Sequence, residues 1–211
     1  MADMNQLKQA VSDLDEDTVR RIMTAIADSG GSEAAAAMQA CQDGMQEVGD
    51  RYESGEYFLG DLIFAGEIMT ESMDIIRPFL SAGSGGKGKM ILCTVHGDIH
   101  DIGKNIVKSM LEAAGFDVID LGIDVLPETI LETAIAEEVR IIALSGVLTL
   151  ALDSMKDVVD AFKKAGRRDK VRIIIGGNPV TAEACKWIGA DAWANSPQRG
   201  VNQCLEWLRE L

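Results

Sequence analysis

Both histidines of this chain lie in one short segment, His96-Gly-Asp-Ile-His100. An imidazole nitrogen is a common metal ligand, and a carboxylate hydrogen-bonded to the other ring nitrogen fixes the tautomer and raises ligand basicity. Asp98 stands two residues before His100 and could supply that carboxylate. The spacing indicates a metal-linked role for His100, although a histidine in a loop is also often purely structural.

The same spacing leaves a zinc site open. Zinc takes three or four protein ligands in a tetrahedral arrangement, and the available further donors are Asp101 and Asp124. The cysteines form no C-x-x-C pair and are expected to be free thiols, with Cys93 inside an apolar core. They are Cys41, Cys93, Cys185 and Cys204.

From residue 90 onward, short apolar runs alternate with amphipathic stretches, which predicts a parallel sheet with helices on both faces. The expected strands are Met90–Val95, Val118–Leu121, Ile141–Leu144, Val171–Ile175 and Ala192–Ala194. The expected helices span about 104–114, 128–138, 153–165, 180–188 and 199–210. Asp153 is predicted as an N-cap, and Gly115 and Gly166 as C-terminal stops.

Polar and glycine-containing segments follow three of these strands. His96–Asn105 follows the first strand, Ser145–Thr149 the third and Gly176–Pro179 the fourth. Ligands of open parallel sheets bind outside the carboxyl ends of the strands, near the point where strand order reverses. We therefore expect the three segments to line one crevice. The first segment lacks G-x-G-x-x-G, so a dinucleotide is not expected there.

The chain before residue 80 has apolar residues at helical spacing, which predicts a small helical bundle. Its last helix, marked by residues from Leu59 to Leu80, should end near Pro78. The stretch Ser81–Lys89 has four glycines in nine residues and reads as a linker. We expect a helical cap over residues 1–82, a linker over 83–89 and an α/β domain over 90–211.

The composition is acidic, with 34 Asp and Glu against 20 Lys and Arg and a formal net charge of −14. This balance argues against nucleic-acid partners and against anionic membrane surfaces, since both attract basic patches. No apolar run reaches the roughly 18 residues of a membrane span. The acidic, polar N-terminus differs from a signal peptide, so a cytoplasmic location is expected.

Taken together, the three segments resemble the cobalamin-binding signature D-x-H-x-x-G, S-x-L and G-G. The signature belongs to methionine synthase and to related corrinoid proteins of methyltransferase systems. It matches Asp98-Ile-His100-Asp-Ile-Gly103, Ser145-Gly-Val147 and Gly176-Gly177, and Met45–Leu59 is similar to the helical cap of that family. The resemblance implies a helical bundle cap followed by a Rossmann-like (flavodoxin-like) five-stranded parallel sheet.

The resemblance implies cobalamin as cofactor, as methylcobalamin or hydroxocobalamin. His100 would be the lower axial ligand of the cobalt in place of the cofactor's benzimidazole (base-off, His-on), and Asp98 would hold the other imidazole nitrogen. The displaced nucleotide tail would run between the sheet and its helices. The implied contacts are Asp98, Ile99, His100, Asp101, Ile102, Gly103, Ser145, Val147, Leu148, Thr149, Gly176, Gly177 and Asn178.

Several positions depart from the family pattern or stay open. Val147 replaces the leucine of S-x-L, and Ala151 stands where methionine synthase has a second serine, so the His–Asp relay should end at Asp98 or in water. In the cap, Tyr57, Phe58 and Met69 either cover the upper corrin face or belong to the bundle core. Lys104 is expected to be a solvated residue in the first turn of a helix.

The function implied is that of a methyl carrier, a subunit of a methyltransferase system rather than a stand-alone catalyst. Its expected partners are a substrate-specific methyltransferase, a methylcorrinoid:acceptor methyltransferase with an acceptor such as tetrahydrofolate, and a reductive activator. The alternatives are the small subunit of an adenosylcobalamin-dependent mutase and a cobalamin-based sensor. A mutase would need a substrate barrel, and a DNA-binding sensor would need a basic DNA-binding domain. We expect neither domain in this chain, because the cap and the α/β domain account for nearly all of its residues.

Overall fold

The computed structural model describes residues 2–79 and 88–210. Contacts between Cα atoms divide the chain into two compact units. The first holds the four N-terminal helices together with Ser109–Gly115, and the second holds the other described residues from Gly88 onward. Within the described ranges, no helix combines the length and apolarity that crossing a bilayer demands.

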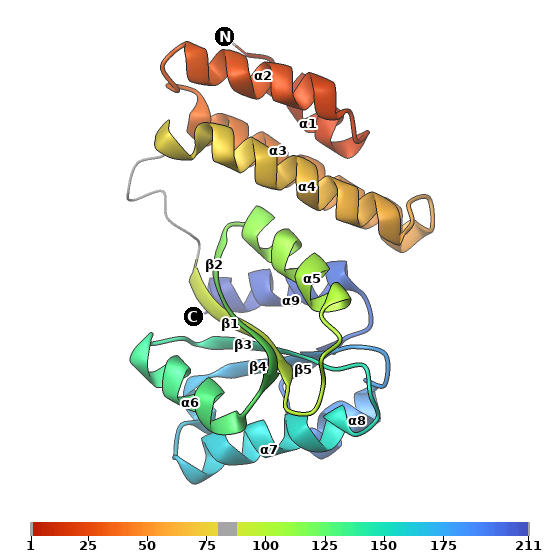
Figure 1. The fold of residues 1–211 in the computed structure, drawn as a ribbon, viewed down its shortest axis with the longest axis vertical. Helices are drawn as coiled ribbons and strands as arrows, with labels where there is room; N and C mark the ends of the chain where they lie inside the picture. The colour runs from red at the N-terminus through yellow and green to blue at the C-terminus, as the bar shows by residue number, and fades with distance from the viewer. Residues whose placement is uncertain (1, 80–87, 211) are drawn as a thin grey trace. The chain divides into compact units, whose positions relative to one another are not determined.

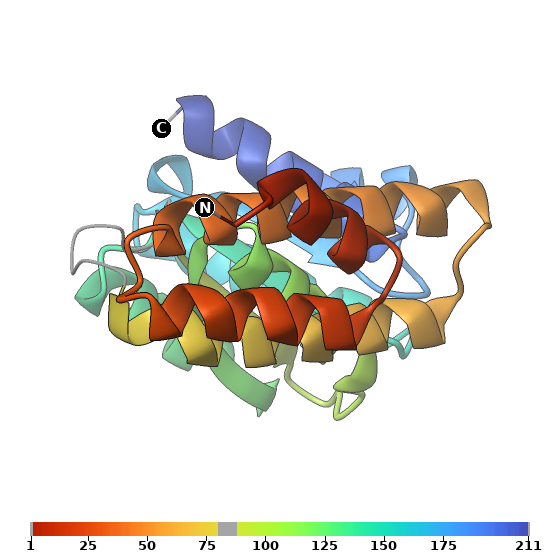
Figure 2. The ribbon, with the colours of Figure 1, turned by 90° about the horizontal axis from the view of Figure 1, so that it is seen from above.

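The first unit is the helical bundle that the sequence predicts. Asp3 and Asp15 accept backbone N–H groups at the starts of the first two helices, and Gly55 ends the third in a left-handed conformation with φ of 82°. Figures 1 and 2 show the helices running side by side, with α1 against α3 and α2 against α4. The elements are α1 (Met4–Ser12), α2 (Glu16–Asp28), α3 (Ala34–Ser54), α4 (Leu59–Ile76) and the short 3-10 helix η1 (Arg77–Phe79).

The second unit contains a five-stranded parallel sheet in the order β2-β1-β3-β4-β5. This is the flavodoxin-like order, so the predicted fold class is confirmed. Helices α5 and α9 cover one face and α6, α7 and α8 the other (Figure 1). The strands are β1 (Gly88–Val95), β2 (Phe116–Val125), β3 (Ile141–Ser145), β4 (Arg172–Gly176) and β5 (Ala192–Ala194). The helices are α5 (Ile102–Ala113), α6 (Pro127–Ala136), α7 (Ala151–Lys164), η2 (Arg168–Lys170), α8 (Ala182–Ile188) and α9 (Pro197–Glu210).

The central strands are buried on both faces, which is why they read as unbroken apolar runs. In β1, Ile91, Cys93 and Val95 join the core beneath α6, α7 and α8. The alternate residues, including Thr94, therefore face α5 and α9. Cys93 is a buried thiol as expected, and so are Cys41, Cys185 and Cys204.

Two predicted boundaries were wrong. Residues 83–87 of the predicted linker lie outside the described residues, but its last two residues, Gly88 and Lys89, belong to β1 and pair with Phe116 and Asp117 of β2. Ladder pairing with β2 extends the strand beyond its apolar run. Asp153 is not an N-cap, since α7 begins two residues earlier and Asp153 lies in its first turn. Gly115 and Gly166 follow their helices with positive φ, as predicted.

Candidate functional site

The candidate site lies where the strand order reverses. Strand β1 has β2 on one side and β3 on the other, so the loops after β1 and β3 meet at the carboxyl edge of the sheet. Hydrogen bonds join these loops, because Asp98 after β1 accepts the backbone N–H groups of Val147 and Leu148 after β3. The loop after β4 joins them through a bond from Gly146 N to Gly176 O. The predicted meeting of the three segments is thus observed.

Asp98 is fully buried at the centre of this edge. Its Oδ1 accepts the backbone N–H of His100 and faces His100 Nδ1, both at 2.9 Å. Its Oδ2 accepts from Val147 N at 2.7 Å and Leu148 N at 3.0 Å. Burial would raise the pKa of this carboxyl, but the hydrogen bonds from Leu148, His100 and Val147 outweigh it and hold the pKa below its ordinary value. Asp98 is therefore an ionised acceptor.

His100 presents the opposite ring nitrogen outward. With Nδ1 held by Asp98, the lone pair of Nε2 is free to bind a metal, and the side chain is 49% exposed. The relay ends at Asp98, whose second oxygen is satisfied by backbone rather than by another side chain. Ala151 is buried in the core cluster and adds no hydroxyl.

A second histidine–aspartate pair lies beside the first. His96 Nδ1 and Gly97 N each lie 2.7 Å from Asp124 Oδ1, and both lower the pKa of that carboxyl, the Gly97 amide more. The buried hydroxyl of Thr94 donates to Asp98 O at 2.5 Å and accepts from Asp124 N at 2.9 Å. This clamp was not predicted, although a threonine next to the end of an apolar strand was a usable signal. It fastens the loop that carries Asp98 to the end of β2.

Lys104 corrects a prediction. It was expected to be solvated, yet its side chain is 3% exposed and its Nζ lies 2.7 Å from both carboxylate oxygens of Asp120 in β2. Asp120 also accepts from Gly122 N and pairs with Lys108. The buried ion pair ties the first turn of α5 to the sheet, just after Gly103.

Exposed apolar side chains lie on the two loops that Asp98 joins and at the start of α5. They come from the loop after β1, from the first residue of α5 and from the loop after β3, and they are Ile99, Ile102, Val147, Leu148 and Leu150. Leu150, which sequence reasoning missed, is 74% exposed, although the apolar run Val147-Leu148-Thr149-Leu150 could have indicated it. Large apolar side chains gathered at one exposed edge suit an apolar ligand.

Glycines leave room at the same edge. A Cβ added to Gly103 in the first turn of α5 would meet no atom within 4 Å, so open space lies above that backbone. Gly177 has φ of 127°, and a Cβ there would lie 1.8 Å from Gly146 O, so a glycine is needed at this position for the two protein loops to approach each other.

Gly176 lies in one register row with Thr94 and Ser145. Three further residues were predicted as cofactor contacts. Asp101 is half-buried, and Thr149 and Asn178 are exposed.

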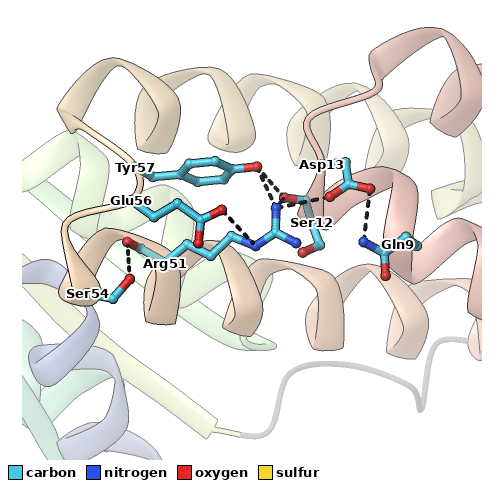
Figure 3. Close-up of polar contacts among 7 residues, drawn as sticks. All are labelled: Gln9, Ser12, Asp13, Arg51, Ser54, Glu56 and Tyr57. Atoms are coloured by element: carbon cyan, nitrogen blue, oxygen red, sulfur yellow. Dashed lines mark hydrogen bonds and ion pairs between the residues drawn. The ribbon is translucent and has the colours of Figure 1, made fainter.

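The cap residues divide into three cases. Tyr57 donates its hydroxyl to Ser12 O at 2.7 Å and accepts from Arg51, whose guanidinium lies over the ring, so Tyr57 is part of the bundle's own polar network (Figure 3). Met69 is 3% exposed in the bundle core, which is the second of the two alternatives that its sequence position left open. Phe58 is 73% exposed and opens α4 beside exposed Leu59 and Ile63, an apolar surface without cover inside the bundle.

The donor set excludes a zinc site within residues 2–79 and 88–210, because no group of three His, Cys, Asp or Glu side chains there could hold a metal. A metal at His100 must therefore bring its other ligands with it, as the cobalt of a corrin ring does. The single ligand, the apolar rim and the open space over Gly103 fit such a macrocycle. A separate cavity of about 1020 Å³ lies at the opposite, amino edge of the sheet, between the ends of α6 and η2.

Two family models and several known proteins match this chain. A B12 binding domain model matches residues 88–201, and a second B12 binding domain model matches residues 4–77. Dimethylamine corrinoid protein 3 of Methanosarcina mazei is 39% identical, over 78% of this chain and 99% of that protein. Trimethylamine corrinoid protein 1 of Methanosarcina acetivorans is 36% identical, over 90% of this chain and 89% of that protein. The crystal structure of a cobalamin-binding protein from Desulfitobacterium hafniense DCB-2 matches with a TM-score of 0.86 at 46% identity, over 98% of this chain and 99% of that one.

Proposed function

This chain belongs to the family of B12-binding corrinoid proteins, and on that premise we propose that it is a methyl carrier that binds cobalamin base-off and His-on. The observation that carries the proposal is the pair His100–Asp98. It offers one free imidazole nitrogen, oriented by a buried carboxylate, at an apolar edge where the described residues form no group of three side chains that could hold a metal ion by themselves.

Bound cobalamin would supply a cobalt centre that can hold a methyl group and release it. The chain's own contribution begins at His100, which donates the Nδ1 proton toward Asp98 and keeps Nε2 as the ligand atom. Because Asp98 stays ionised, it strengthens the imidazole as a ligand without taking its proton. The backbone N–H groups of Val147 and Leu148 hold this carboxylate in place.

The apolar side chains around His100 would exclude water from the lower face of the ring. Ile99, Ile102 and Leu150 are the most exposed of them and would gain most from cover, since burying apolar surface contributes roughly 25 cal/mol per Å². The nucleotide tail would pass between the sheet and the α5 and α9 side, along Ser145 and Gly176. In the cap, Phe58 is the residue we assign to the upper face.

The partners we propose are a substrate-specific methyltransferase, an acceptor methyltransferase that uses tetrahydrofolate or a similar acceptor, and a reductive activator. Two relatives are named for dimethylamine and trimethylamine. A methylated amine is therefore the first donor to test. The chain's net charge of −14 favours docking to partners with a basic surface.

The carrier role is tested with the protein loaded with methylcobalamin that has an isotopically labelled methyl group. We expect the label to pass to tetrahydrofolate, in the presence of a corrinoid:tetrahydrofolate methyltransferase, faster from the loaded protein than from free methylcobalamin at equal concentration. The His100→Ala protein should lose that advantage. Equal rates from bound and free cofactor would contradict a carrier role.

A further inference from the structure

Gln198 has a buried amide whose carbonyl oxygen has no partner. The residue is 2% exposed, and its Nε2 donates to Asn202 Oδ1 at 3.0 Å. Its Oε1 is also buried, and no described residue supplies a hydrogen bond to it. A buried acceptor left unsatisfied is costly and uncommon in native proteins, so it calls for a ligand or another explanation.

Gln198 lies at the same carboxyl edge of the sheet as His100. It is the second residue of α9, which begins shortly after β5 ends at Ala194. Val201 and Cys204 follow it at steps of three and are buried, so Gln198 belongs to the face of α9 that packs on β4 and β5. A Cβ added to Gly200 would lie 3.5 Å from the Cβ of Ala194, which shows how closely this end of the helix approaches the strand.

The sheet beneath this part of α9 has small side chains at its edge. Thr94, Ser145, Gly176 and Ala194 pair with one another across four adjacent strands in one register row. The row faces α5 and α9, because the alternate residues belong to the core on the other face. Small side chains let an elongated ligand approach the backbone. Gln198 is on the helix that covers this face of the sheet, near the end of the row that β5 contributes.

We propose that Gln198 Oε1 accepts a hydrogen bond from the nucleotide tail of the bound corrinoid. The proposal rests on the proposed function, since it requires a tail displaced from the cobalt. An amide oxygen can only accept, so its partner is an O–H or N–H group. The ribose of the tail has hydroxyls, and a lower base such as adenine adds an amino group, whereas dimethylbenzimidazole has no such donor.

The test compares Gln198→Leu with the wild type for three ligands that differ only in the tail. These are hydroxocobalamin, the corresponding cobamide with an adenine base, and cobinamide, which lacks the nucleotide. We expect Gln198→Leu to bind hydroxocobalamin about three- to tenfold more weakly, the effect of one net hydrogen bond, and to bind cobinamide as the wild type does. A loss confined to the adenine cobamide would identify the base as the donor, and an equal loss with both nucleotide-bearing corrinoids would identify the ribose.

Gln203→Leu is the matched control, because Gln203 is on the same helix and bonds to the exposed Glu206. It should leave all three affinities unchanged. The ligand-free Gln198→Leu protein should unfold at the same temperature as the wild type or higher, since the substitution removes an unsatisfied polar group.

Unchanged affinity for both nucleotide-bearing corrinoids would overturn the proposal. So would an equal loss with cobinamide, because the residue would then act through the protein rather than the tail. A lower unfolding temperature with unaltered affinity would also overturn it. If the wild type binds neither hydroxocobalamin nor cobinamide, the proposed function itself fails, which is distinct from a failure confined to Gln198.

Discussion

Asp98 does more than orient one imidazole. Its two oxygens accept four hydrogen bonds, two from His100 and one each from Val147 and Leu148, so it joins the loops after β1 and β3. Only a carboxylate can satisfy donors on both sides. Asp98 therefore orients the proposed ligand His100 and also joins two loops.

Replacing Asp98 with Asn should therefore damage both roles. The amide has one acceptor oxygen, so its NH2 would face N–H donors on one side or the other. We expect the free energy of unfolding to fall by about 1–3 kcal/mol and cobalamin affinity to fall about 10–100-fold. Urea unfolding and spectrophotometric titration measure the two effects. Asp124→Asn is the control, because its Oδ1 can still accept from Gly97 and His96; equal losses in both variants would contradict this role of Asp98.

Substitutions at Gly103 should affect the stability of the protein and its affinity for cobalamin differently. A Cβ there meets nothing within 4 Å, and the residue is helical, so Gly103→Ala should stabilise the cofactor-free protein by about 0.5–1 kcal/mol. Gly103→Leu should fold equally well but bind cobalamin at least about tenfold more weakly, since the larger side chain fills the space assigned to the corrin. Thermal unfolding and titration test this, and a Leu variant with full affinity would show that the open space is not the binding site.

The sequence predicted which residues form the site better than it predicted their hydrogen-bond and ion-pair partners. The pair Asp98–His100 was predictable because its two residues are neighbours in sequence, and the end of the relay at Asp98 or in water was predicted from Ala151, which stands where the resembled family has a serine. The pairs His96–Asp124 and Lys104–Asp120 depend on how β1 aligns with β2, and that register shifts twice, between Leu92 and Cys93 and between Cys93 and Val95. No local pattern encodes such shifts, so the burial of Lys104 was missed.

At the scale of elements, α5 is the part whose position matters most. It begins two residues after His100, its first turn contains Gly103, and the ion pair of Lys104 with Asp120 anchors that turn to β2. Burial would raise the pKa of Asp120, but Lys104, the Gly122 amide and Lys108 outweigh it and lower the pKa. The anchor is thus an ionised pair at neutral pH.

We expect Asp120→Asn to cost roughly 3 kcal/mol of unfolding free energy, because it leaves the Lys104 ammonium buried without its counter-charge. Lys104→Met combined with Asp120→Asn should recover much of this loss. Because the folded-state pKa of Asp120 is lowered, its stabilisation is full above the unfolded value of about 3.9 and is lost as the pH falls through the lower folded value. Urea unfolding at several pH values should show the difference between wild type and Asp120→Asn shrinking below about pH 4; a constant difference would contradict the ionised anchor.

At the scale of the whole molecule, the chain combines a bundle and a parallel sheet, and each contributes exposed apolar side chains that its own core does not use. In the sheet unit they lie on the loops after β1 and β3 and at the start of α5, and in the bundle they are Phe58, Leu59 and Ile63. The sequence predicted both units from periodicity, because parallel strands and amphipathic helices leave clear patterns. It did not predict which apolar residues stay exposed, since helical spacing alone does not distinguish core from ligand contact.

The cap assignment predicts an effect on access rather than on affinity. Phe58→Ala should leave cobalamin affinity within about twofold of the wild type but speed the exchange of the upper cobalt ligand for cyanide, followed by absorbance, because an apolar cover is removed. Ile135→Ala, an exposed apolar residue of α6, is the control and should leave the exchange rate unchanged. If Phe58→Ala leaves the rate unaltered, Phe58 is not a cover.

The measurement that most directly tests the axial role of His100 is electron paramagnetic resonance of the cobalamin-loaded protein, with its cobalt reduced to the paramagnetic state. Protein grown with histidine labelled with the heavy nitrogen isotope is compared with unlabelled protein. If His100 is the axial ligand, the nitrogen splitting of the cobalt signal should change from a triplet to a doublet on labelling, and it should disappear in His100→Ala. A triplet that persists in the labelled protein would show that the cofactor's own base, and not His100, binds the cobalt.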